Sequence, residues 1–350
     1  MQPLFNRASI DFTCDNEIGQ EGKNSKVFLA TDHQFDSQIV VKRIDINRFK
    51  SVDDYFQEVR KLHQTRHSFV TPVYYGCKDN DYVYIAMPYY AEGSLKAKLQ
   101  SSNLTIREIL RYANHYLTGL NHIHSKGLLH LDLKPDNFLI NDRNEAIVSD
   151  FGISVHMDEQ GFAHPNYMYY KYFTPEELRD EQASIASDIF QIGLTLYQGV
   201  NGIEQFNAHM PGTDDAMQEA ILNGSFPSRS QYQYHVPVIL RQIINKCLNV
   251  DQLSRYESVL ELLNSLNKID KIIDWRFESD DSTSTWIEQT DNRKERIVVC
   301  RKKDNNMFEV TSLKRNLVSG SEQRRHKHCH SGVPGSQIRS TIQSILRDDW

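Results

Sequence analysis

The stretch from His130 to Ile140, HLDLKPDNFLI, constrains this chain more than any other part of its sequence. It places Lys134 two residues after Asp132 and the side-chain amide of Asn137 five residues after it. A carboxylate can orient an attacking hydroxyl, a lysine can offset charge on a moving phosphoryl group, and an amide oxygen can ligate a metal ion. Together these groups favour phosphoryl transfer to a hydroxyl, and they leave both protein and small-molecule acceptors open.

The same stretch resembles the catalytic loop of protein kinases, usually written H-R-D-L-x-x-x-N. Asp150 opens a D-F-G triplet thirteen residues after Asn137, a separation typical of one β-hairpin. By this resemblance Asp132 is the catalytic base and Lys134 acts at the γ-phosphoryl group of the substrate ATP. Asn137 and Asp150 are then the ligands of Mg²⁺, an ion that prefers a few oxygen ligands and retains several waters.

A glycine-containing bend lies near the N-terminus between two predicted strands. Gly19 and Gly22 have no Cβ, so their backbone N–H groups could approach phosphate oxygens closely. The bend resembles the kinase glycine-rich loop, although one extra residue separates these glycines and Ser25 stands where a third is usual. An ordinary hairpin is the alternative.

Lys42 follows a β-branched run just beyond this bend, where kinases keep the lysine that binds the α- and β-phosphates. Such a lysine needs a carboxylate partner. A capping signal at residues 51–54 predicts a helix that carries Glu58, our first candidate. Asp54 is the second candidate, with a shorter side chain and a capping role of its own. The alternative for Lys42 is a solvated residue at the edge of a strand. The alternative for Glu58 is a place on a solvated helix face.

Two further strands are predicted before a linker at residues 88–90. By resemblance Met87 is the gatekeeper, and the backbone of the linker meets adenine. Pro88 has no N–H group, so only its carbonyl could contact the base. A capped helix follows from Thr105, and we expect its histidines, among them His124, to be packing or surface groups and not metal ligands. The other residues that the resemblance places around ATP are Val27, Val40, Tyr89, Tyr90 and Leu139.

The loop-like segment from residue 153 to 173 is rich in tyrosine and lacks serine and threonine between Ser154 and Thr174. Leu131 replaces the catalytic-loop arginine that commonly receives a phosphate from this segment, which removes a bidentate partner. We infer that activity does not depend on a phosphothreonine switch. Tyrosine autophosphorylation and simple packing of a substrate platform are equal alternatives for Tyr167, Tyr169, Tyr170 and Tyr172.

Three further positions match structural residues of kinases. Thr174-Pro175-Glu176 resembles the A-P-E signature, and Arg255 lies where kinases keep the arginine that pairs with this glutamate. Asp188 begins a predicted buried helix, at the position that anchors the catalytic-loop backbone in kinases. Help with capping that helix is the alternative role for Asp188.

Composition excludes several classes of protein. A hydrophobic content of 39% and a charged content of 25% are those of a globular protein, and a net charge of −6 argues against a role centred on nucleic acid. No apolar run approaches the ~18 residues of a membrane span, and the first residues lack a signal-peptide core. Five scattered cysteines indicate reduced thiols. We expect a soluble, cytoplasmic protein.

The resemblance implies an α+β, bilobal kinase fold over residues 11–268. It consists of a β-rich N-lobe at about 11–87, a hinge at 88–90 and a helical C-lobe at about 91–268. Residues 271–350 form a small basic extension, since 15 Lys and Arg against 12 Asp and Glu give +3. Alternation predicts three strands at 284–290, 295–303 and 307–315, followed by a helix at 336–349.

The extension could dock on the lobes, bind a substrate, or hold an acidic partner. The basic residues expected to contact such a partner are Arg301, Lys302, Lys303, Lys314 and Arg315. A metal site is a weaker alternative than a solvated basic loop for His326, His328, Cys329 and His330, because no second group of ligands accompanies them.

The sequence therefore predicts an ATP-dependent protein kinase that acts on a protein substrate. The D-L-K-P form of the catalytic loop favours serine or threonine as the acceptor, whereas Tyr169 weakens that preference. The rival from another class is a pseudokinase, a scaffold that binds nucleotide or partners without turnover, and it is supported by the altered glycine bend and Leu131. A small-molecule phosphotransferase is the third alternative.

Overall fold

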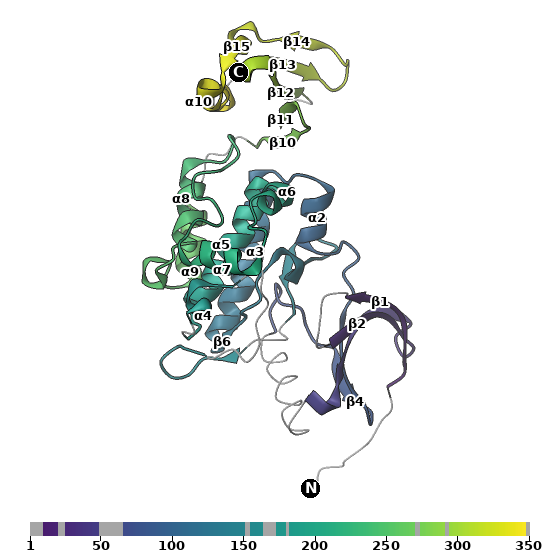
Figure 1. Cartoon of the computed structure of the whole chain (residues 1–350). Coiled ribbons are helices and arrows are strands. Elements are labelled where there is room, and N and C mark those ends of the chain that lie inside the picture. The colour runs from purple at the N-terminus through teal and green to yellow at the C-terminus, as the bar shows by residue number, and fades with distance from the viewer. Residues whose placement is uncertain are drawn as a thin grey trace.

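The computed structural model describes residues 10–19, 25–48, 66–150, 155–163, 173–179, 182–269, 274–290 and 294–347. The chain forms an N-terminal β-sheet, a central helical part, and a C-terminal sheet with one helix, as Figure 1 shows. The predicted α+β fold with a C-terminal meander plus helix is thereby confirmed. None of the helices within the described ranges combines the length and apolar character needed to cross a bilayer.

The N-terminal sheet has five antiparallel strands in the order β1-β2-β3-β5-β4. Its small apolar core is made by Ala30, Ile39, Val41 and Ala86. Lys42 lies on β3, opposite Val27 of β2 and Ile85 of β5. The strands are β1 (Phe12–Gly19), β2 (Ser25–Asp32), β3 (Ser37–Asp45), β4 (Tyr75–Lys78) and β5 (Tyr82–Pro88).

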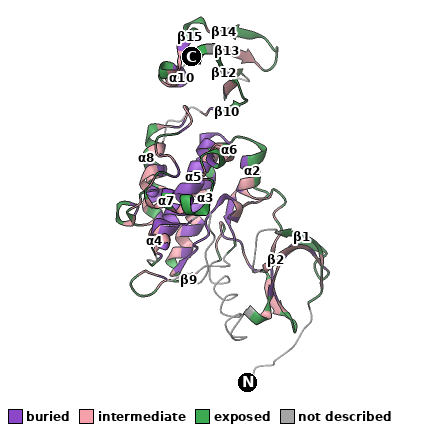
Figure 2. Ribbon diagram, viewed as in Figure 1, coloured by how far each residue is buried: buried purple, intermediate pink, exposed green. Residues whose placement is uncertain are grey.

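The helical part contains the main hydrophobic core, which is packed around α3 and α5. Thr105 and Glu108 form a capping box at the start of α3, as the sequence predicts. Helix α5 is buried almost throughout, and Figure 2 shows it at the centre of the helical part. The helices are α2 (Leu95–Ser101), α3 (Ile106–Ser125), α4 (Pro175–Leu178), α5 (Ile185–Asn201), α6 (Ile203–Ala208), α7 (Asp214–Leu222), α8 (Val238–Cys247) and α9 (Val259–Leu266).

Short strands at the junction between the sheet and the helices carry the polar motifs. The N–H of Thr71 donates to the carbonyl of Val148 (2.9 Å), and the N–H of Val148 donates to the carbonyl of Phe69 (2.9 Å). These bonds join the segment before β4 to the strand that leads into Asp150. The short elements are β6 (Leu128–Leu129), η2 (Pro135–Asn137), β7 (Phe138–Ile140), β8 (Ala146–Val148) and β9 (Val155–His156).

The C-terminal sheet has the order β10-β11-β12-β13-β14, with β15 also paired to β13. The three predicted strands and the helix are present. Three shorter strands, β10, β14 and β15, were not predicted, because segments of three to five residues are too short to show alternation. The elements are β10 (Arg276–Ser279), β11 (Thr283–Thr290), β12 (Lys294–Lys302), β13 (Met307–Asn316), β14 (Glu322–Arg324), β15 (His330–Pro334) and α10 (Gly335–Arg347).

Among the described residues, contacts attach the C-terminal extension to the start of α3 and to the segment before α8. The carboxylate of Asp274 accepts a hydrogen bond from the N–H of Arg107 in the first turn of α3 (3.2 Å). The Nη2 of Arg339 on α10 donates to the carbonyl of Tyr232 (2.8 Å), and the ring of Tyr234 stacks on Trp286 of β11 at 5.9 Å. Contacts at these two separate sites restrict the orientation of the extension more than contacts at a single site would.

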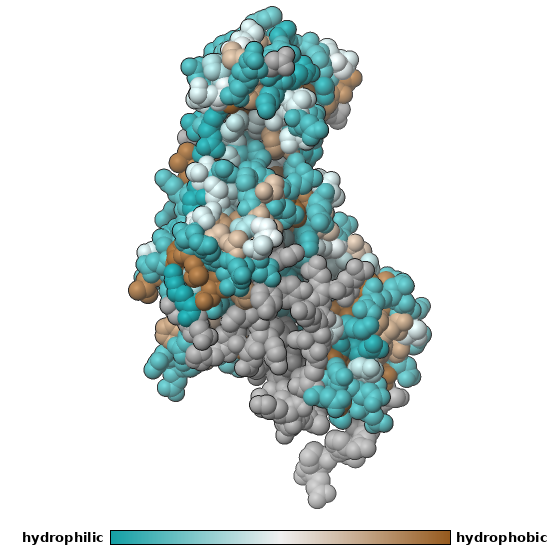
Figure 3. Space-filling model, viewed as in Figure 1, coloured by the Kyte–Doolittle hydropathy of each residue, from teal (hydrophilic) through white to brown (hydrophobic). Residues whose placement is uncertain are grey.

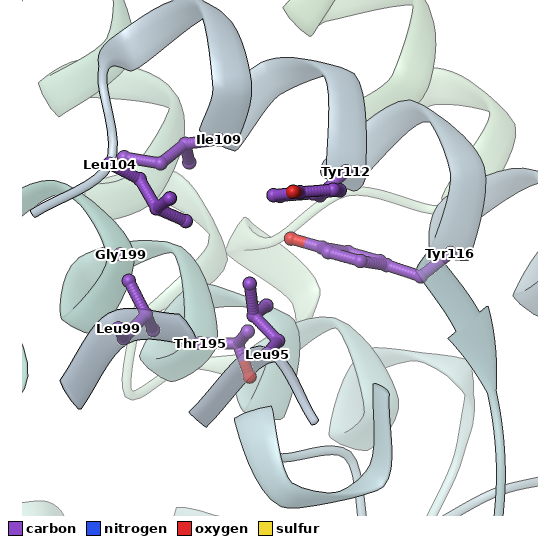
Figure 4. Close-up of a pocket in the computed structure, with 8 residues that line it drawn as sticks. All are labelled: Leu95, Leu99, Leu104, Ile109, Tyr112, Tyr116, Thr195 and Gly199. Carbon is purple, nitrogen blue, oxygen red and sulfur yellow. The ribbon is translucent and has the colours of Figure 1, made fainter. Parts of the chain in front are cut away.

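A small pocket lies between α2, α3 and α5 (Figure 4). The Tyr116 hydroxyl points into it, whereas most of the remaining lining is aliphatic. Its volume of about 10 Å³ is room for one water molecule at most, so we do not regard it as a ligand site. Gly199 and Ile109 lie on its wall.

Replacing Gly199 with alanine is expected to stabilise the protein. A Cβ at this position would meet the Cγ2 of Ile109 at 3.3 Å, and that side chain borders the pocket and can shift into it. Alanine also restricts the unfolded chain and favours helix by about 0.5–1 kcal/mol. Urea denaturation should show a higher free energy of unfolding with an unchanged slope.

Gly193→Ala is the matched control on the same helix. There a Cβ would lie 2.8 Å from the Cβ of Cys247 and 3.0 Å from Leu248, closer than the nearest contact at Gly199. Alanine raises the helix propensity equally in both variants. The steric overlap with Cys247 and Leu248 is therefore the difference between them, and we expect it to lower the free energy of unfolding of Gly193→Ala. Equal destabilisation by the two substitutions would show that the pocket gives Ile109 no room to move.

Candidate active site

The buried carboxylate of Asp188, in the first turn of α5, binds the backbone of the catalytic-loop stretch. It accepts hydrogen bonds from the N–H of His130 (2.9 Å) and of Leu131 (2.8 Å), and it contacts the Nε2 of His124 at 2.7 Å. Burial alone would raise the pKa of Asp188, but His124, His130 and the backbone donors outweigh it and lower that pKa. The carboxylate therefore stays ionised although no part of it is exposed.

Gln191 lies one helical turn after Asp188 and completes this attachment. Its Nε2 donates to the carbonyl of Leu131 (2.9 Å), and its Oε1 accepts from the N–H of Leu133 (2.8 Å). Between them Asp188 and Gln191 bind both backbone groups of Leu131, which has a φ of 64°. A leucine rarely adopts this left-handed conformation, and the surrounding hydrogen bonds hold it there.

His130 links the catalytic-loop stretch to the strand that precedes Asp150. Its Nδ1 accepts a hydrogen bond from the N–H of Asp132 (3.3 Å), so its Nε2 carries the proton and donates to the carbonyl of Ser149 (2.9 Å). The hydroxyl of Ser149 in turn donates to the carbonyl of Asn137 (2.9 Å). The positions of Asp132, Asn137 and Asp150 are therefore coupled through short contacts.

Asp132, Lys134 and Asn137 converge as one polar group. The Nζ of Lys134 lies 3.0 Å from the Oδ1 of Asp132, and the Nδ2 of Asn137 donates to its Oδ2 (2.8 Å). Burial raises the pKa of Asp132, whereas the Lys134 ammonium opposes that rise. Because the amide nitrogen of Asn137 points to Asp132, the amide oxygen is directed away from it.

The N-terminal sheet contributes Lys42 to the same site. Its Nζ lies 2.7 Å from the Oδ1 of Asp150, although 108 residues separate them in the sequence. Lys42 is largely buried on β3, and Asp150, with a φ of 58°, is 48% exposed at its side chain. The structure thus brings together a cation from the sheet and a carboxylate from the helical part.

The donor atoms at this site fit a divalent metal ion. A carboxylate on Asp150 and an amide oxygen on Asn137 are both hard oxygen ligands. Among the described residues no group of three or more His, Cys, Asp and Glu side chains could hold an ion by itself. An ion bound by these two side chains would take its remaining ligands from water and from the phosphates of a nucleotide.

Comparison with known proteins gives the family. The protein kinase domain matches residues 12–266 of the chain. The chain belongs to the protein kinase family. A protein kinase domain uses ATP as a substrate, in general with a divalent metal ion, and acts on proteins.

Several bacterial serine/threonine-protein kinases are similar to this kinase domain. A probable one from Clostridium perfringens is 27% identical over 72% of this chain and 37% of its own length. PknD of Chlamydia muridarum is 28% identical over 71% of this chain and 30% of its own length. PrkC of Bacillus subtilis is 26% identical over 69% of this chain and 38% of its own length. The chain thus matches about a third of the length of these relatives.

The structure places the remaining predicted nucleotide-site residues around the junction of the sheet and the helices. Val27 pairs with Lys42, and Val40 with Met87, across neighbouring strands. Tyr89 and Tyr90 follow β5, where burial raises the pKa of Tyr90 to about 12. Gly19 ends β1, and Leu139 lies on β7. Outside the described residues lie Gly22, Asp54, Glu58, Tyr167, Tyr169, Tyr170 and Tyr172.

Glu176 and Arg255 form a fully buried ion pair. The Nη1 and Nη2 of Arg255 each lie 2.8 Å from an oxygen of Glu176, and the hydroxyl of Ser187 donates to the same carboxylate (2.7 Å). Burial would raise the pKa of Glu176, but the contacts with Arg255 and Ser187 lower it. This pair joins α4 to the start of α5 and to the loop that follows α8.

Leu131 packs its side chain in a small apolar cluster of described residues. The cluster contains Leu129, Ala163 and Ala183, and its members are buried. Backbone hydrogen bonds of 2.9 Å run in both directions between Ala163 and Ala183. Backbone and apolar contacts therefore join Ala163, within the tyrosine-rich segment, to Ala183, which lies beyond the end of that segment.

Two residues of the site were missed by the sequence analysis. Gln191 belongs to no motif, although a glutamine within an apolar helix is itself a signal of a buried hydrogen bond. His124 was expected to be a packing or surface group. Its side chain is indeed buried, and its contact with Asp188 was not anticipated. His326, His328, Cys329 and His330 form no metal cluster within the part of the chain that the structure describes.

The raised pKa of Glu177 in α4, next to the buried Glu176, can be tested by measuring stability against pH. Glu177 is buried, and its Oε2 accepts hydrogen bonds from the N–H (2.8 Å) and the hydroxyl (3.0 Å) of Thr174. Burial, together with the nearby Glu176 and Asp188, raises the pKa of Glu177 from 4.5 to about 7. The folded protein then binds a proton that the unfolded chain releases, so this residue lowers stability as pH rises from about 4.5 to 7.

We predict that Glu177→Gln flattens this pH dependence. The amide oxygen of glutamine can accept the same two hydrogen bonds, so the cap of α4 is kept while the titrating group is removed. Denaturation at pH 5 to 8 should show a smaller loss of stability with rising pH than in the wild type. An identical slope in the variant would mean that the pKa of Glu177 is not raised.

Glu176→Gln is the neighbouring control with the opposite expectation. It leaves Arg255 buried without its carboxylate, which typically costs about 3–5 kcal/mol. The free energy of unfolding should therefore fall at neutral pH, where Glu177→Gln is neutral or stabilising. Equal effects of the two substitutions would contradict the different environments assigned to these adjacent carboxyl groups.

Proposed function

We propose that this chain is an ATP-dependent protein kinase that transfers the γ-phosphoryl group of Mg·ATP to serine or threonine hydroxyls. The observation that carries the proposal is the convergence of Asp132, Lys134 and Asn137 with the Lys42–Asp150 pair. The serine/threonine kinases to which the chain is similar support the choice of acceptor. The chain matches only about a third of the length of these relatives, so the activity of the whole protein is proposed here and is not inferred from their names.

In this proposal Asp132 orients the acceptor hydroxyl and accepts its proton. Burial makes its carboxylate more basic than an exposed one, while the Lys134 ammonium at 3.0 Å favours its ionised form. Lys134 can also offset negative charge at the γ-phosphoryl group. Phosphoryl transfer makes few covalent demands on a protein, so positioning and electrostatics supply most of the catalysis.

The nucleotide would lie between β3 and the catalytic-loop stretch. Lys42 would bind the α- and β-phosphates, and Asn137 and Asp150 would hold Mg²⁺. That ion supplies positive charge that neutralises the phosphate oxygens. Two further roles rest on the sequence resemblance alone. Glu58 would be the partner of Lys42, and Gly22 would lie near the phosphates. The adenine would meet residues 88–90, with Val27, Val40, Met87 and Leu139 around it.

Activity without a phosphothreonine switch is a further part of the proposal. Leu131 offers no charge to a phosphate, and its side chain packs instead in an apolar cluster with Ala163 and Ala183. Autophosphorylation of the four tyrosines stays a prediction. We also propose that the kinase domain covers residues 11–268, with a separate extension at 271–350. Five free thiols support a cytoplasmic location.

Asp132→Asn tests the proposed base. Incubation with Mg·ATP and a generic protein substrate should label the substrate with the wild-type chain, and the variant should be slower by about 10²–10⁴-fold. Nucleotide binding, measured by thermal shift, should persist because Asp132 is not proposed to hold the nucleotide. Mass spectrometry of the products identifies the acceptor residue.

Asp142→Asn is the matched control, the same change at an exposed turn residue ten positions along the chain. Its rate should equal that of the wild type. Nucleotide binding without turnover in the wild type would favour the pseudokinase alternative. Turnover that is unaffected by Asp132→Asn would leave the kinase activity intact but remove Asp132 as the base.

A further inference from the structure

Gln191 is a polar side chain within an apolar helix. It is 2% exposed, and its neighbours Phe190 and Ile192 on α5 are fully buried. Hydrophilic side chains cover most of the surface that Figure 3 shows outside the grey residues, and water can satisfy them there. In the interior an amide that lacks hydrogen bonds costs free energy. Gln191 therefore depends on partners within the protein.

The amide of Gln191 contacts the backbone on both sides of Asp132. Its Nε2 donates to the carbonyl of Leu131 (2.9 Å), and its Oε1 accepts from the N–H of Leu133 (2.8 Å). These two groups belong to the peptide unit before Asp132 and to the peptide unit after it. Because a peptide unit is planar, a bond to one of its atoms restricts the rotation of the whole plane. One amide thus restricts both backbone dihedrals of Asp132.

The other two polar groups of these peptide units are bound as well. The N–H of Asp132 donates to the Nδ1 of His130 (3.3 Å), and the carbonyl of Asp132 accepts from the Nδ2 of Asn137 (2.7 Å). His130 and Asn137 belong to the catalytic-loop stretch itself and would move with it. Gln191 belongs to α5, so its bonds connect the two peptide units to the buried core of the helical part.

Asp188 and Gln191 act on different parts of the stretch. Asp188 accepts from the N–H groups of His130 and Leu131, which precede Asp132. Gln191, three residues later on the same helix, binds the two units that flank Asp132. Leu131 has a left-handed φ of 64°, which is unfavourable for a residue with a side chain. Without Gln191 the peptide unit after Leu131 could turn toward a more favourable conformation.

Water is a poor substitute for the Gln191 amide. Leu131 is 4% exposed and Leu133 is fully buried. An apolar side chain in place of Gln191 would leave the carbonyl of Leu131 and the N–H of Leu133 without these partners, and buried polar groups that lack partners are costly. The backbone around Asp132 would then rearrange to find other partners.

We propose that Gln191 is a positioning residue for phosphoryl transfer, whose amide sets the direction in which the Asp132 carboxylate meets the acceptor hydroxyl. This inference rests on the proposed kinase function and names a residue on which that function depends. A displacement of about 1 Å at a reacting group can lower the rate about 10²-fold, so a small rotation of the two peptide planes is sufficient. The Lys42–Asp150 contact involves other elements, and nucleotide binding should survive the loss of Gln191.

Gln191→Met tests the inference in the full chain. Methionine has nearly the length and volume of glutamine, but it has no N–H donor and only a weak acceptor. With Mg·ATP and a generic protein substrate, kcat should fall about 10²-fold while the KM for ATP stays that of the wild type. Thermal unfolding shows whether the variant is folded at the assay temperature. If it is not, Gln191→Asn, which withdraws the amide by one methylene and lengthens both bonds, should show the same split.

Tyr197→Phe is the matched control on the same helix. It removes a buried hydroxyl that donates to the carbonyl of Gln231 (2.8 Å), so it also deletes a bond from an α5 side chain to a backbone carbonyl. Its kcat should equal that of the wild type. An equal fall of kcat in the two variants would show that any lost hydrogen bond of α5 has this effect, and the assignment to Gln191 would be wrong.

The double variant Gln191→Met, Asp132→Asn shows whether Gln191 acts through Asp132. If it does, Gln191→Met should leave kcat unchanged in the Asp132→Asn background, because the base that it positions is already lost. A further 10²-fold loss there, or an unchanged kcat in the folded single variant, would overturn the inference while the turnover of the wild type upholds the proposed function. A wild-type chain without turnover would contradict the proposed function itself, and the inference would fall with it.

Discussion

The interaction on which the rest of this site depends is the one between the Asp188 carboxylate and the backbone of His130 and Leu131. The carboxylate is ionised and has no exposure to water, and three donors at 2.7–2.9 Å compensate for its burial. Breaking such a buried contact costs far more than the contact gains in net stability, because the partner groups are left unsatisfied. The buried helix α5 therefore determines where the catalytic-loop stretch can lie.

From this anchor the geometry of the polar groups follows in short steps. His130 binds the carbonyl of Ser149, Ser149 binds Asn137, and Asn137 binds Asp132. Asp150 comes directly after Ser149, and Lys42 reaches it from the N-terminal sheet. Each link is local, yet together they unite elements that lie far apart in the sequence. An arrangement of this kind supplies the fixed electrostatics that phosphoryl transfer needs.

Much of this could be predicted because the motifs are short and their spacing is fixed by local structure. Asp132, Lys134 and Asn137 lie within six residues, and Asp150 follows after one hairpin. Gln191 could not be assigned, because its role depends on a tertiary contact with Leu131 and Leu133 that no spacing reveals. The same holds for His124, whose contact with Asp188 joins two helices. In the extension, alternation identified the long strands, but which face each basic residue occupies required the register.

The most direct test of this account is the turnover number of Asp188→Asn with Mg·ATP and a protein substrate. Asparagine has the same size, but one of its two terminal atoms is an NH₂ group and cannot accept a hydrogen bond. That group would face one of the donors, from His124, His130 or Leu131, whose hydrogen bonds Asp188 now accepts. The account predicts that kcat falls about 10²-fold through a displaced catalytic loop, while the affinity for nucleotide is retained. A turnover number equal to that of the wild type, in a folded variant, would contradict the claim that this carboxylate positions the catalytic groups.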